Sequence, residues 1–153
     1  MNKTLSYQTF KTQVQPQYES TVIQRNDTAN TFSSQDLLTK PPKVLIVIPA
    51  YNEEKNIGAV LKGIQNQSPG LPILVINDGS SDNTEKVVLE HNAEVISLPY
   101  NSGYGIALQT GFLYAVKNDF SIVIQMDSDG QHDPANIKDL IEAVQKDNCD
   151  VVI

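Results

Sequence analysis

Short runs of apolar, mostly β-branched residues recur along this chain, and their spacing limits the folds that it can adopt. Four such runs span residues 43–48, 72–77, 94–98 and 121–126, and a fifth begins at Cys149. Between the runs, apolar residues return at helical spacing. Strands that alternate with helices form right-handed βαβ units, so the sequence predicts an α/β fold with a mostly parallel sheet and helices on both faces.

Capping residues indicate where the helices begin. Asn52 is expected to cap the first helix, with Glu53 and Glu54 in its first turn. Asp133 is expected to cap the fourth, whose first residue, Pro134, suits that position. The helices are predicted over 53–67, from Ser81 or Asp82 to Glu90, over 104–117 and from 134 onward.

Residues 1–42 differ in composition from the rest of the chain. They are rich in Thr, Gln, Ser and Asn and show no sustained strand or helix period, which is typical of a disordered segment. Pro41 and Pro42 then hold the chain extended at the boundary. The sequence predicts a disordered leader over 1–42 and an α/β domain over 43–153.

Charge and hydropathy exclude several classes of protein. The 153 residues carry a net charge of −7, and residues 41–153 hold fifteen acidic and seven basic side chains. Such a body repels polyphosphate, so no nucleic-acid partner is expected. No stretch reaches the roughly 18 uninterrupted apolar residues of a membrane span. The absence of a secretory signal and the single cysteine favour a cytoplasmic location, with peripheral association at the cytoplasmic face of a membrane as an option.

Each of the first four runs is followed by a polar loop. The loops read PAYNEE, DGSSDN, PYNSGYG and DSDGQHD, and they begin at residues 49, 78, 99 and 127. Loops at the carboxyl ends of parallel strands share one rim of the sheet, where such folds bind their ligands. We therefore expect the polar side chains of these loops to line one crevice.

Asp127 and Asp129 carry the strongest chemical signal on this rim. Their spacing lets both carboxylates reach one hard divalent cation, and Gly130 permits the tight turn that follows. Gln131 can add a side-chain carbonyl oxygen. In isolation such a pair is typical of solvated loop residues, but its place beside three other polar loops favours a Mg²⁺ or Mn²⁺ site.

Three further residues on the rim have alternative roles. Helix capping accounts for Asp133 without a metal. His132 is either an exposed loop residue, which we favour, or a ligand or acid–base group. Asp78 either forms an Asx turn that supports Gly79 and Ser80 or accepts a hydrogen bond from a nucleobase.

The sequence does not match other nucleotide-binding or metal-binding motifs, because the residues that they require at fixed positions are missing. The first strand-to-helix turn reads PAYNEE, where a dinucleotide site requires Gly-x-Gly-x-x-Gly, and no Walker lysine motif occurs. An EF-hand loop that starts at Asp127 would require glycine at the position of His132.

Four segments, each formed by a predicted strand and the loop that follows it, resemble the motifs of a known enzyme family. The segments VIPAYNEEKNIG, LVINDGSSDNT, LPYNSGYGIALQTG and IQMDSDGQHDP resemble the successive motifs of family 2 glycosyltransferases of the GT-A fold. The similarity is greatest to the branch that contains dolichyl-phosphate mannose synthase and polyprenyl-phosphate glycosyltransferases. It covers residues 43–153 and implies a Rossmann-like N-terminal, nucleotide-sugar-binding part of a catalytic domain. Because family members continue into an acceptor-side half, the chain looks truncated, and the resemblance implies an enzyme of which this chain alone is expected to turn over poorly or not at all.

The resemblance implies a UDP- or GDP-sugar donor, a polyprenyl or dolichyl phosphate acceptor, a divalent metal and inversion at the sugar. The nucleoside contacts that it implies are Pro49, Tyr51, Glu53, Ile76 and Asp78. For the metal and diphosphate it implies Asp127, Ser128, Asp129 and Gln131, with Asp127 and Asp129 as the catalytic pair. Asn77 departs from the Asp that is common at its position.

Two other functions compete with this one. In the first, the chain is a non-catalytic or regulatory fragment that only binds nucleotide. In the second, Asp127 is the nucleophile of a phosphohydrolase similar to haloacid dehalogenases, although Gly130, Gln131 and His132 stand where that class has a hydroxyl residue. The predicted open edge of the last strand also offers a surface for pairing with another chain.

Overall fold

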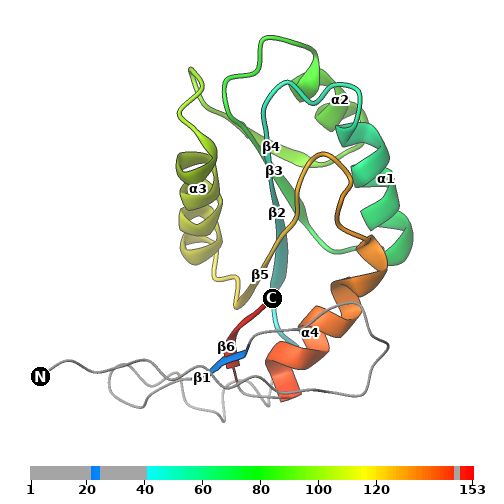
Figure 1. Cartoon of the computed structure of the whole chain (residues 1–153), viewed down its shortest axis with the longest axis vertical. Helices are drawn as coiled ribbons and strands as arrows, with labels where there is room; N and C mark the ends of the chain where they lie inside the picture. The colour runs from blue at the N-terminus through cyan, green and yellow to red at the C-terminus, as the bar shows by residue number, and fades with distance from the viewer. Residues whose placement is uncertain (1–21, 25–40, 147–148) are drawn as a thin grey trace, which may run out of the picture. The chain divides into compact units, whose positions relative to one another are not determined.

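The computed structural model describes residues 22–24, 41–146 and 149–153 (Figure 1). Most of the predicted disordered leader therefore lies outside the described residues. The chain divides into two compact units. The larger unit falls within residues 33–137 and holds the candidate site, while the smaller unit combines residues from the two ends of the chain.

The larger unit is built on a parallel sheet of four strands in the order β4-β3-β2-β5. These strands are β2 (Val44–Ala50), β3 (Ile73–Asn77), β4 (Glu94–Ser97) and β5 (Ile122–Gln125). β2 and β3 are buried along their whole lengths, as expected for central strands that are covered on both faces. The predicted α/β fold with a parallel sheet is confirmed.

Three helices connect these strands, and they cover both faces of the sheet. They are α1 (Ile57–Gln67), α2 (Thr84–Glu90) and α3 (Tyr104–Lys117). In Figure 1, α1 and α2 lie on one face and α3 on the other. From β2 the chain moves to β3 and β4, and then crosses back past β2 to β5. Right-handed crossovers in opposite directions place their helices on opposite faces, which explains this arrangement.

The reversal of direction creates a switch point between β2 and β5. The loops that leave the carboxyl ends of these neighbouring strands diverge, which opens a crevice between them. The two predicted loops that begin at residues 49 and 127 are the ones that follow β2 and β5. The topology therefore places Asp127 at the position where α/β sheets bind ligands.

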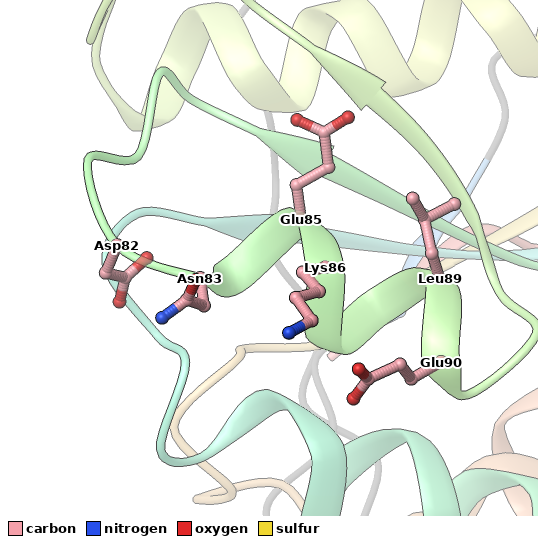
Figure 2. A pocket seen from close by; sticks show the side chains of 6 residues that line it. All are labelled: Asp82, Asn83, Glu85, Lys86, Leu89 and Glu90. Carbon is pink, nitrogen blue, oxygen red and sulfur yellow. The ribbon is translucent and has the colours of Figure 1, made fainter.

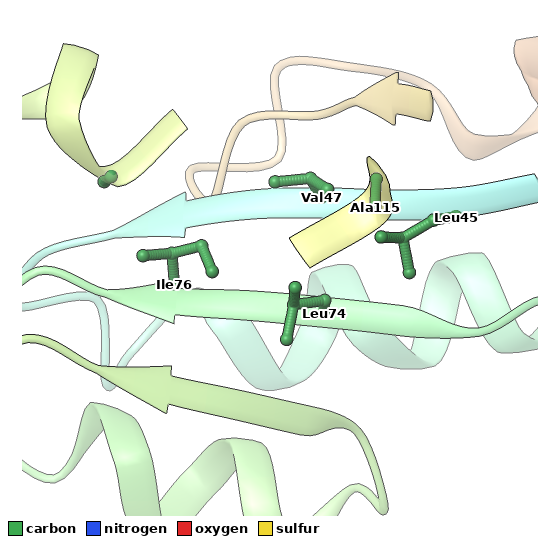
Figure 3. Packing of buried hydrophobic residues seen from close by; sticks show 6 residues of the cluster. Leu45, Val47, Leu74, Ile76 and Ala115 are labelled. Carbon is green, nitrogen blue, oxygen red and sulfur yellow. The ribbon is translucent and has the colours of Figure 1, made fainter. Parts of the chain in front are cut away.

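The core on the α3 side of the sheet combines large strand residues with small helix residues (Figure 3). The buried cluster consists of Leu45, Val47, Leu74, Ile76, Ala107 and Ala115. Gly111 lies between the two alanines at a spacing of four, on the same face of α3. A Cβ atom on Gly111 would lie 2.3 Å from Cγ1 of Val47, so this close approach of α3 to β2 requires glycine.

The last strand does not join the parallel sheet. β6 (Cys149–Val152) instead pairs antiparallel with β1 (Val22–Gln24) in a sheet of two strands. The predicted strand at Cys149 is therefore present, but it adds no fifth strand to the parallel sheet, and its partner β1 lies within the segment predicted to be a disordered leader. An apolar run indicates a strand but not its partner, because the same pattern suits either direction of pairing.

The fourth predicted helix begins as expected. Oδ1 of Asp133 accepts a hydrogen bond from the N–H of Ala135 (2.9 Å), and Pro134 starts a 3₁₀ turn, η2 (Pro134–Asn136). The helix α4 (Ile137–Lys146) follows directly. The capping role predicted for Asp133 is confirmed. Within the described ranges, no helix combines the length and apolar character needed to cross a membrane.

Candidate functional site

A pocket of about 370 Å³ lies at the switch point of the sheet. Its lining consists of Pro49, Ala50, Tyr51, Glu53, Asp78, Asn101, Tyr104, Ala107, Asp127, Ser128 and Asp129. Seven of the nine residues that the sequence predicted for the site belong to this lining. The four loops after β2, β3, β4 and β5 each contribute, so the predicted shared crevice is present.

Ile76 and Gln131 are the two predicted site residues that lie elsewhere. The side chain of Ile76 is fully buried in the core cluster under α3, so it does not reach the pocket. Gln131 is exposed, and its backbone N–H donates to Oδ1 of Asp129 (2.9 Å) in a local turn. Strand alternation directs the side chain of Ile76 to the core, and the backbone N–H of Gln131 closes a local turn on Asp129. A contact of Ile76 with the nucleoside, or of the Gln131 side chain with a metal, stays a prediction.

The loop after β2 is hydrogen-bonded to the loop after β3. The N–H of Asn52 donates to Oγ of Ser80 (2.9 Å), and the side-chain oxygen of Asn52 accepts from the N–H of Ser81 (2.8 Å). Asn52 has a φ of 56°, a left-handed conformation that asparagine tolerates. The predicted helix cap at Asn52 is therefore wrong: its side chain binds the neighbouring loop, and α1 begins only at Ile57.

Glu53 and Glu54 also join the two loops and do not lie in a first helical turn. The carboxylate of Glu54 accepts hydrogen bonds from the backbone N–H and the side-chain amide of Asn83, each at 3.0 Å. In the other direction, the N–H of Glu54 donates to Oδ2 of Asp82 (3.1 Å), and the N–H of Glu53 donates to Oγ1 of Thr84 (2.8 Å). These hydrogen bonds, which run in both directions, hold together the loops after β2 and β3, both of which line the pocket.

Asp82 is the acceptor at the centre of that network. It also accepts hydrogen bonds from the backbone N–H (3.0 Å) and the hydroxyl of Thr84, the first residue of α2. The predicted start of α2 at Ser81 or Asp82 is thereby moved to Thr84. Burial alone would raise the pKa of Asp82, but the hydrogen bonds from Thr84 and Glu54 outweigh it and lower the pKa below its usual 3.8.

Asp82→Asn is expected to change how stability depends on pH. Because the pKa of Asp82 in the folded chain is below 3.8, its carboxylate stabilises the fold above that pH, and this stabilisation is lost as the pH falls below 3.8. The variant should be less stable than the unmodified chain at neutral pH, and the difference should shrink at about pH 3. Urea unfolding across this range measures it. A difference that stays constant with pH would contradict the role assigned to the Asp82 charge.

Asp78 is buried at the end of β3 and binds the start of α3. It is 4% exposed, and its two carboxylate oxygens accept hydrogen bonds from the N–H groups of Ser102 (2.7 Å) and Gly103 (2.8 Å). A negative charge is favourable at this end of a helix. The turn considered for Asp78 is instead closed by Asn77, whose Oδ1 accepts from the N–H of Ser80 (3.1 Å). A contact between Asp78 and a nucleobase stays a prediction.

Gly79 allows the loops after β3 and β4 to touch. Its φ is 68°, and a Cβ atom at this position would lie 2.4 Å from the carbonyl carbon of Tyr100. Both facts require glycine. The loop that carries Asn101 and Ser102 is therefore held against the end of β3.

Asp127 lies two residues after the end of β5, and three side chains contact its carboxylate. Its Oδ1 accepts hydrogen bonds from Nε2 of Gln125 (3.0 Å) and from the hydroxyl of Tyr104 (3.4 Å). Its Oδ2 lies 3.6 Å from Nε2 of His132. Burial, followed by the nearby charge of Asp127, raises the pKa of Tyr104 above 10.0, so the hydroxyl is a donor at neutral pH.

His132 is exposed, as we favoured, but its ring folds back onto Asp127. Nδ1 of His132 accepts a hydrogen bond from the backbone N–H of Asp127 (3.2 Å). A ring nitrogen that accepts such a bond carries no proton, so the proton of the neutral ring is assigned to Nε2. His132 therefore supports Asp127 from outside the pocket lining.

The donor set at Asp127 and Asp129 suits a hard divalent cation that binds together with a diphosphate. Both residues line the pocket, and carboxylate oxygens are the ligands that Mg²⁺ prefers. Among the described residues, no group of three or more Asp, Glu, His or Cys side chains is arranged to hold a metal ion without help. Two carboxylates completed by phosphate oxygens and water are a common arrangement for Mg²⁺.

A second depression lies along α2 and has a different character (Figure 2). Its volume is about 560 Å³, and its lining consists of Asp82, Asn83, Glu85, Lys86, Leu89 and Glu90. All six residues belong to α2 or to the two positions before it, so no second element closes this depression. We assign it no chemistry.

Tyr104, Asn101 and Ala107 line the pocket but were not among the predicted site residues. They belong to the loop after β4 and to the first turn of α3. The sequence had placed this loop on the shared rim without assigning a role to its side chains. Which of them point into the pocket depends on the packing of α3 against β2.

Comparisons with known proteins identify the family. The model for "Glycosyl transferase family 2" matches residues 45–153. The polyprenol monophosphomannose synthase of Mycolicibacterium smegmatis is 31% identical in an alignment of 108 positions that covers 67% of this chain and 41% of that protein. The UDP-N-acetylglucosamine–dolichyl-phosphate N-acetylglucosaminyltransferase of Methanococcus voltae is 33% identical over 127 residues, with 72% and 50% covered. The chain thus spans half or less of the length of these relatives.

A solved structure shares the fold. Glucosyl-3-phosphoglycerate synthase of Mycobacterium tuberculosis, crystallised with Mn²⁺, UDP and glucosyl-3-phosphoglycerate, superposes with a TM-score of 0.58 at 28% identity. The match covers 69% of this chain and 40% of that one. These findings argue against the phosphohydrolase alternative. Because the family model matches most of its length, this chain belongs to glycosyl transferase family 2.

Proposed function

We propose that residues 43–153 form the nucleotide-sugar-binding part of a glycosyltransferase that transfers a sugar, with inversion and a divalent cation, to a polyprenyl or dolichyl phosphate. The observation that carries this proposal is that one pocket at the switch point collects side chains from several loops. It brings Asp127 and Asp129 from the end of β5 together with Tyr51 and Asp78 from the loops after β2 and β3.

The side of the pocket formed by the loops after β2 and β3 suits a nucleoside. Tyr51 is 46% exposed and offers an aromatic face at the pocket wall. Each oxygen of Asp78 accepts one backbone N–H, and a carboxylate oxygen has a second lone pair for a ring N–H of a base. The network through Glu54 and Asp82 keeps these two loops in place before a ligand binds, which lowers the entropy cost of binding.

The other side of the pocket suits a diphosphate only when a cation is present. Glu53, Asp78, Asp127 and Asp129 all line the pocket, and four carboxylates would repel a diphosphate. Asp127 and Asp129 would hold a Mg²⁺ or Mn²⁺ ion. When bound, the ion supplies positive charge that stabilises the negative charge growing on the departing diphosphate.

The proposal for the sugar acceptor rests on the names of the similar proteins. The two relatives described above are named for transfer to polyprenol or dolichyl phosphate, whereas the structural relative is named for a phosphoglycerate product. Both acceptor types carry a phosphate. We propose the lipid phosphate, whose oxygen attacks the anomeric carbon on the face opposite the diphosphate and so inverts the configuration.

Metal-dependent nucleotide binding tests this proposal. In calorimetric titrations, UDP or GDP is expected to bind at least about tenfold more tightly with Mn²⁺ than with EDTA, because the cation offsets the carboxylate charges. The titrations also determine which base the pocket prefers. If Mn²⁺ or Mg²⁺ changes the affinity for neither nucleotide, the proposal is wrong.

A transfer assay separates catalysis from binding alone. Any labelled sugar that this chain transfers should move from the preferred donor to undecaprenyl or dolichyl phosphate and not to 3-phosphoglycerate. Tight metal-dependent binding without transfer to either acceptor would favour the alternative, a chain that binds nucleotide without catalysis. Transfer to 3-phosphoglycerate alone would replace the proposed acceptor.

A further inference from the structure

Tyr104 lies beside Asp127 although the two residues come from different elements. It is the first residue of α3, whereas Asp127 follows β5. Tyr104 lines the pocket, and its hydroxyl donates to Oδ1 of Asp127 at 3.4 Å. This oxygen also accepts from Nε2 of Gln125. Two donors on one oxygen restrict the rotation of the carboxylate.

Two independent contacts determine where Tyr104 lies. At the start of α3, the carboxylate of Asp78 binds the N–H groups of Ser102 and Gly103. Further along, Gly111 allows the helix to pack closely against Val47 of β2. Tyr104 is therefore anchored by the buried end of β3 on one side and by the core on the other.

We propose that the Tyr104 hydroxyl is a positioning group that orients Asp127 for a divalent cation, and that Asp78 places this hydroxyl through the start of α3. The inference rests on the proposed function, because it concerns the same metal-dependent site. Donors that bind a metal-ligating carboxylate orient it and tune its basicity, and their removal typically weakens metal affinity 10–100-fold. Tyr104 would then link two parts of the site: Asp78, which is expected to contact the nucleoside, and Asp127, which is expected to bind the metal.

The competing explanation is that Tyr104 contributes only a ring to the pocket wall. Tyr104→Phe distinguishes the two, because it keeps the ring and removes the hydroxyl. A wall residue would leave the affinity for Mn²⁺ unchanged in this variant. A positioning residue would leave the nucleotide affinity without metal unchanged and weaken only the metal-dependent part.

The experiment uses the whole chain and two tyrosine variants. Binding of Mn²⁺ in the presence of UDP or GDP is followed by electron paramagnetic resonance of the free ion, and nucleotide affinity is measured with Mn²⁺ and with EDTA. Tyr104→Phe is expected to weaken Mn²⁺ binding about tenfold, with the EDTA affinity and the urea midpoint unchanged. The matched control is Tyr114→Phe, which removes a hydroxyl on the same helix that donates to Glu94, away from the pocket lining. It should leave Mn²⁺ binding unchanged.

Each contrary outcome has a distinct meaning. If Tyr104→Phe binds Mn²⁺ as tightly as the unmodified chain, the positioning role is wrong. If it loses nucleotide affinity equally with Mn²⁺ and with EDTA, Tyr104 belongs to the pocket wall and the inference is overturned. If the unmodified chain shows no metal-dependent nucleotide binding, the proposed function itself fails, and this result appears before any substitution is made.

Discussion

Asp127→Asn is expected to abolish the effect of Mn²⁺ on the affinity for a nucleoside diphosphate. The substitution removes the charge of one of the two carboxylates proposed as metal ligands and weakens the acceptor for Tyr104 and Gln125. Since the loss of a supporting residue alone costs 10–100-fold in metal affinity, the loss of a ligand should cost at least about 100-fold. The affinity measured with EDTA should stay the same or rise, because one repelling charge is gone. Titration calorimetry with and without Mn²⁺ measures both effects.

Asp133→Asn is the matched control for this prediction. It makes the same change of charge six residues further along, at a residue whose role is to cap the turn that begins at Pro134. Asparagine caps helices about as well as aspartate, so stability and Mn²⁺ dependence should both be retained. Equal losses in the two variants would show that net charge, and not a ligand at Asp127, controls nucleotide binding.

Gly111→Ala is expected to destabilise the larger unit strongly. The new Cβ atom would lie 2.3 Å from Cγ1 of Val47, a separation that requires α3 to move away from β2 or Val47 to adopt a poor rotamer. Overpacking of this kind costs about 1–3 kcal/mol. Because α3 also carries Tyr104, the movement should weaken nucleotide binding as well. Urea unfolding gives the change in stability.

Gly105→Ala, on the same helix, is expected to have the opposite effect and to stabilise the fold. A Cβ atom at Gly105 would meet no heavy atom within 4 Å. Replacing glycine by alanine at an unstrained helical position reduces the conformational entropy of the unfolded chain and stabilises by about 0.4–1 kcal/mol. If both substitutions destabilise to the same extent, the close contact between Gly111 and Val47 is not what makes the first one costly.

The sheet and its helices were predictable because they depend on local patterns. Continuous apolar runs, helical spacing between them and the right-handed crossover rule are sufficient to predict α1 to α3 on a parallel sheet. The partner of β6 was not predictable in this way. Cys149–Val152 pairs with Val22–Gln24, more than 120 residues earlier in the chain, and no local pattern encodes that choice.

The sequence predicted which residues form the candidate site but not which hydrogen bonds connect its loops. The four polar loops indicated that Tyr51, Asp78, Asp127 and Asp129 would share a crevice, and they do. The sequence did not reveal that Asn52, Glu54 and Asp82 form hydrogen bonds between the loops after β2 and β3. These hydrogen bonds join residues 28–29 positions apart, so they exist only once β2 and β3 are paired.

The sequence by itself determined the order of strands and helices and the loops that carry the acids, because strand and helix periods are properties of neighbouring residues. Only the tertiary structure decided which side chains enter the pocket. The side chain of Ile76 is buried in the core under α3, and Tyr104 reaches Asp127 because α3 packs closely on the sheet. The separation between α3 and the sheet is determined by contacts between residues far apart in the chain, such as Gly111 and Val47.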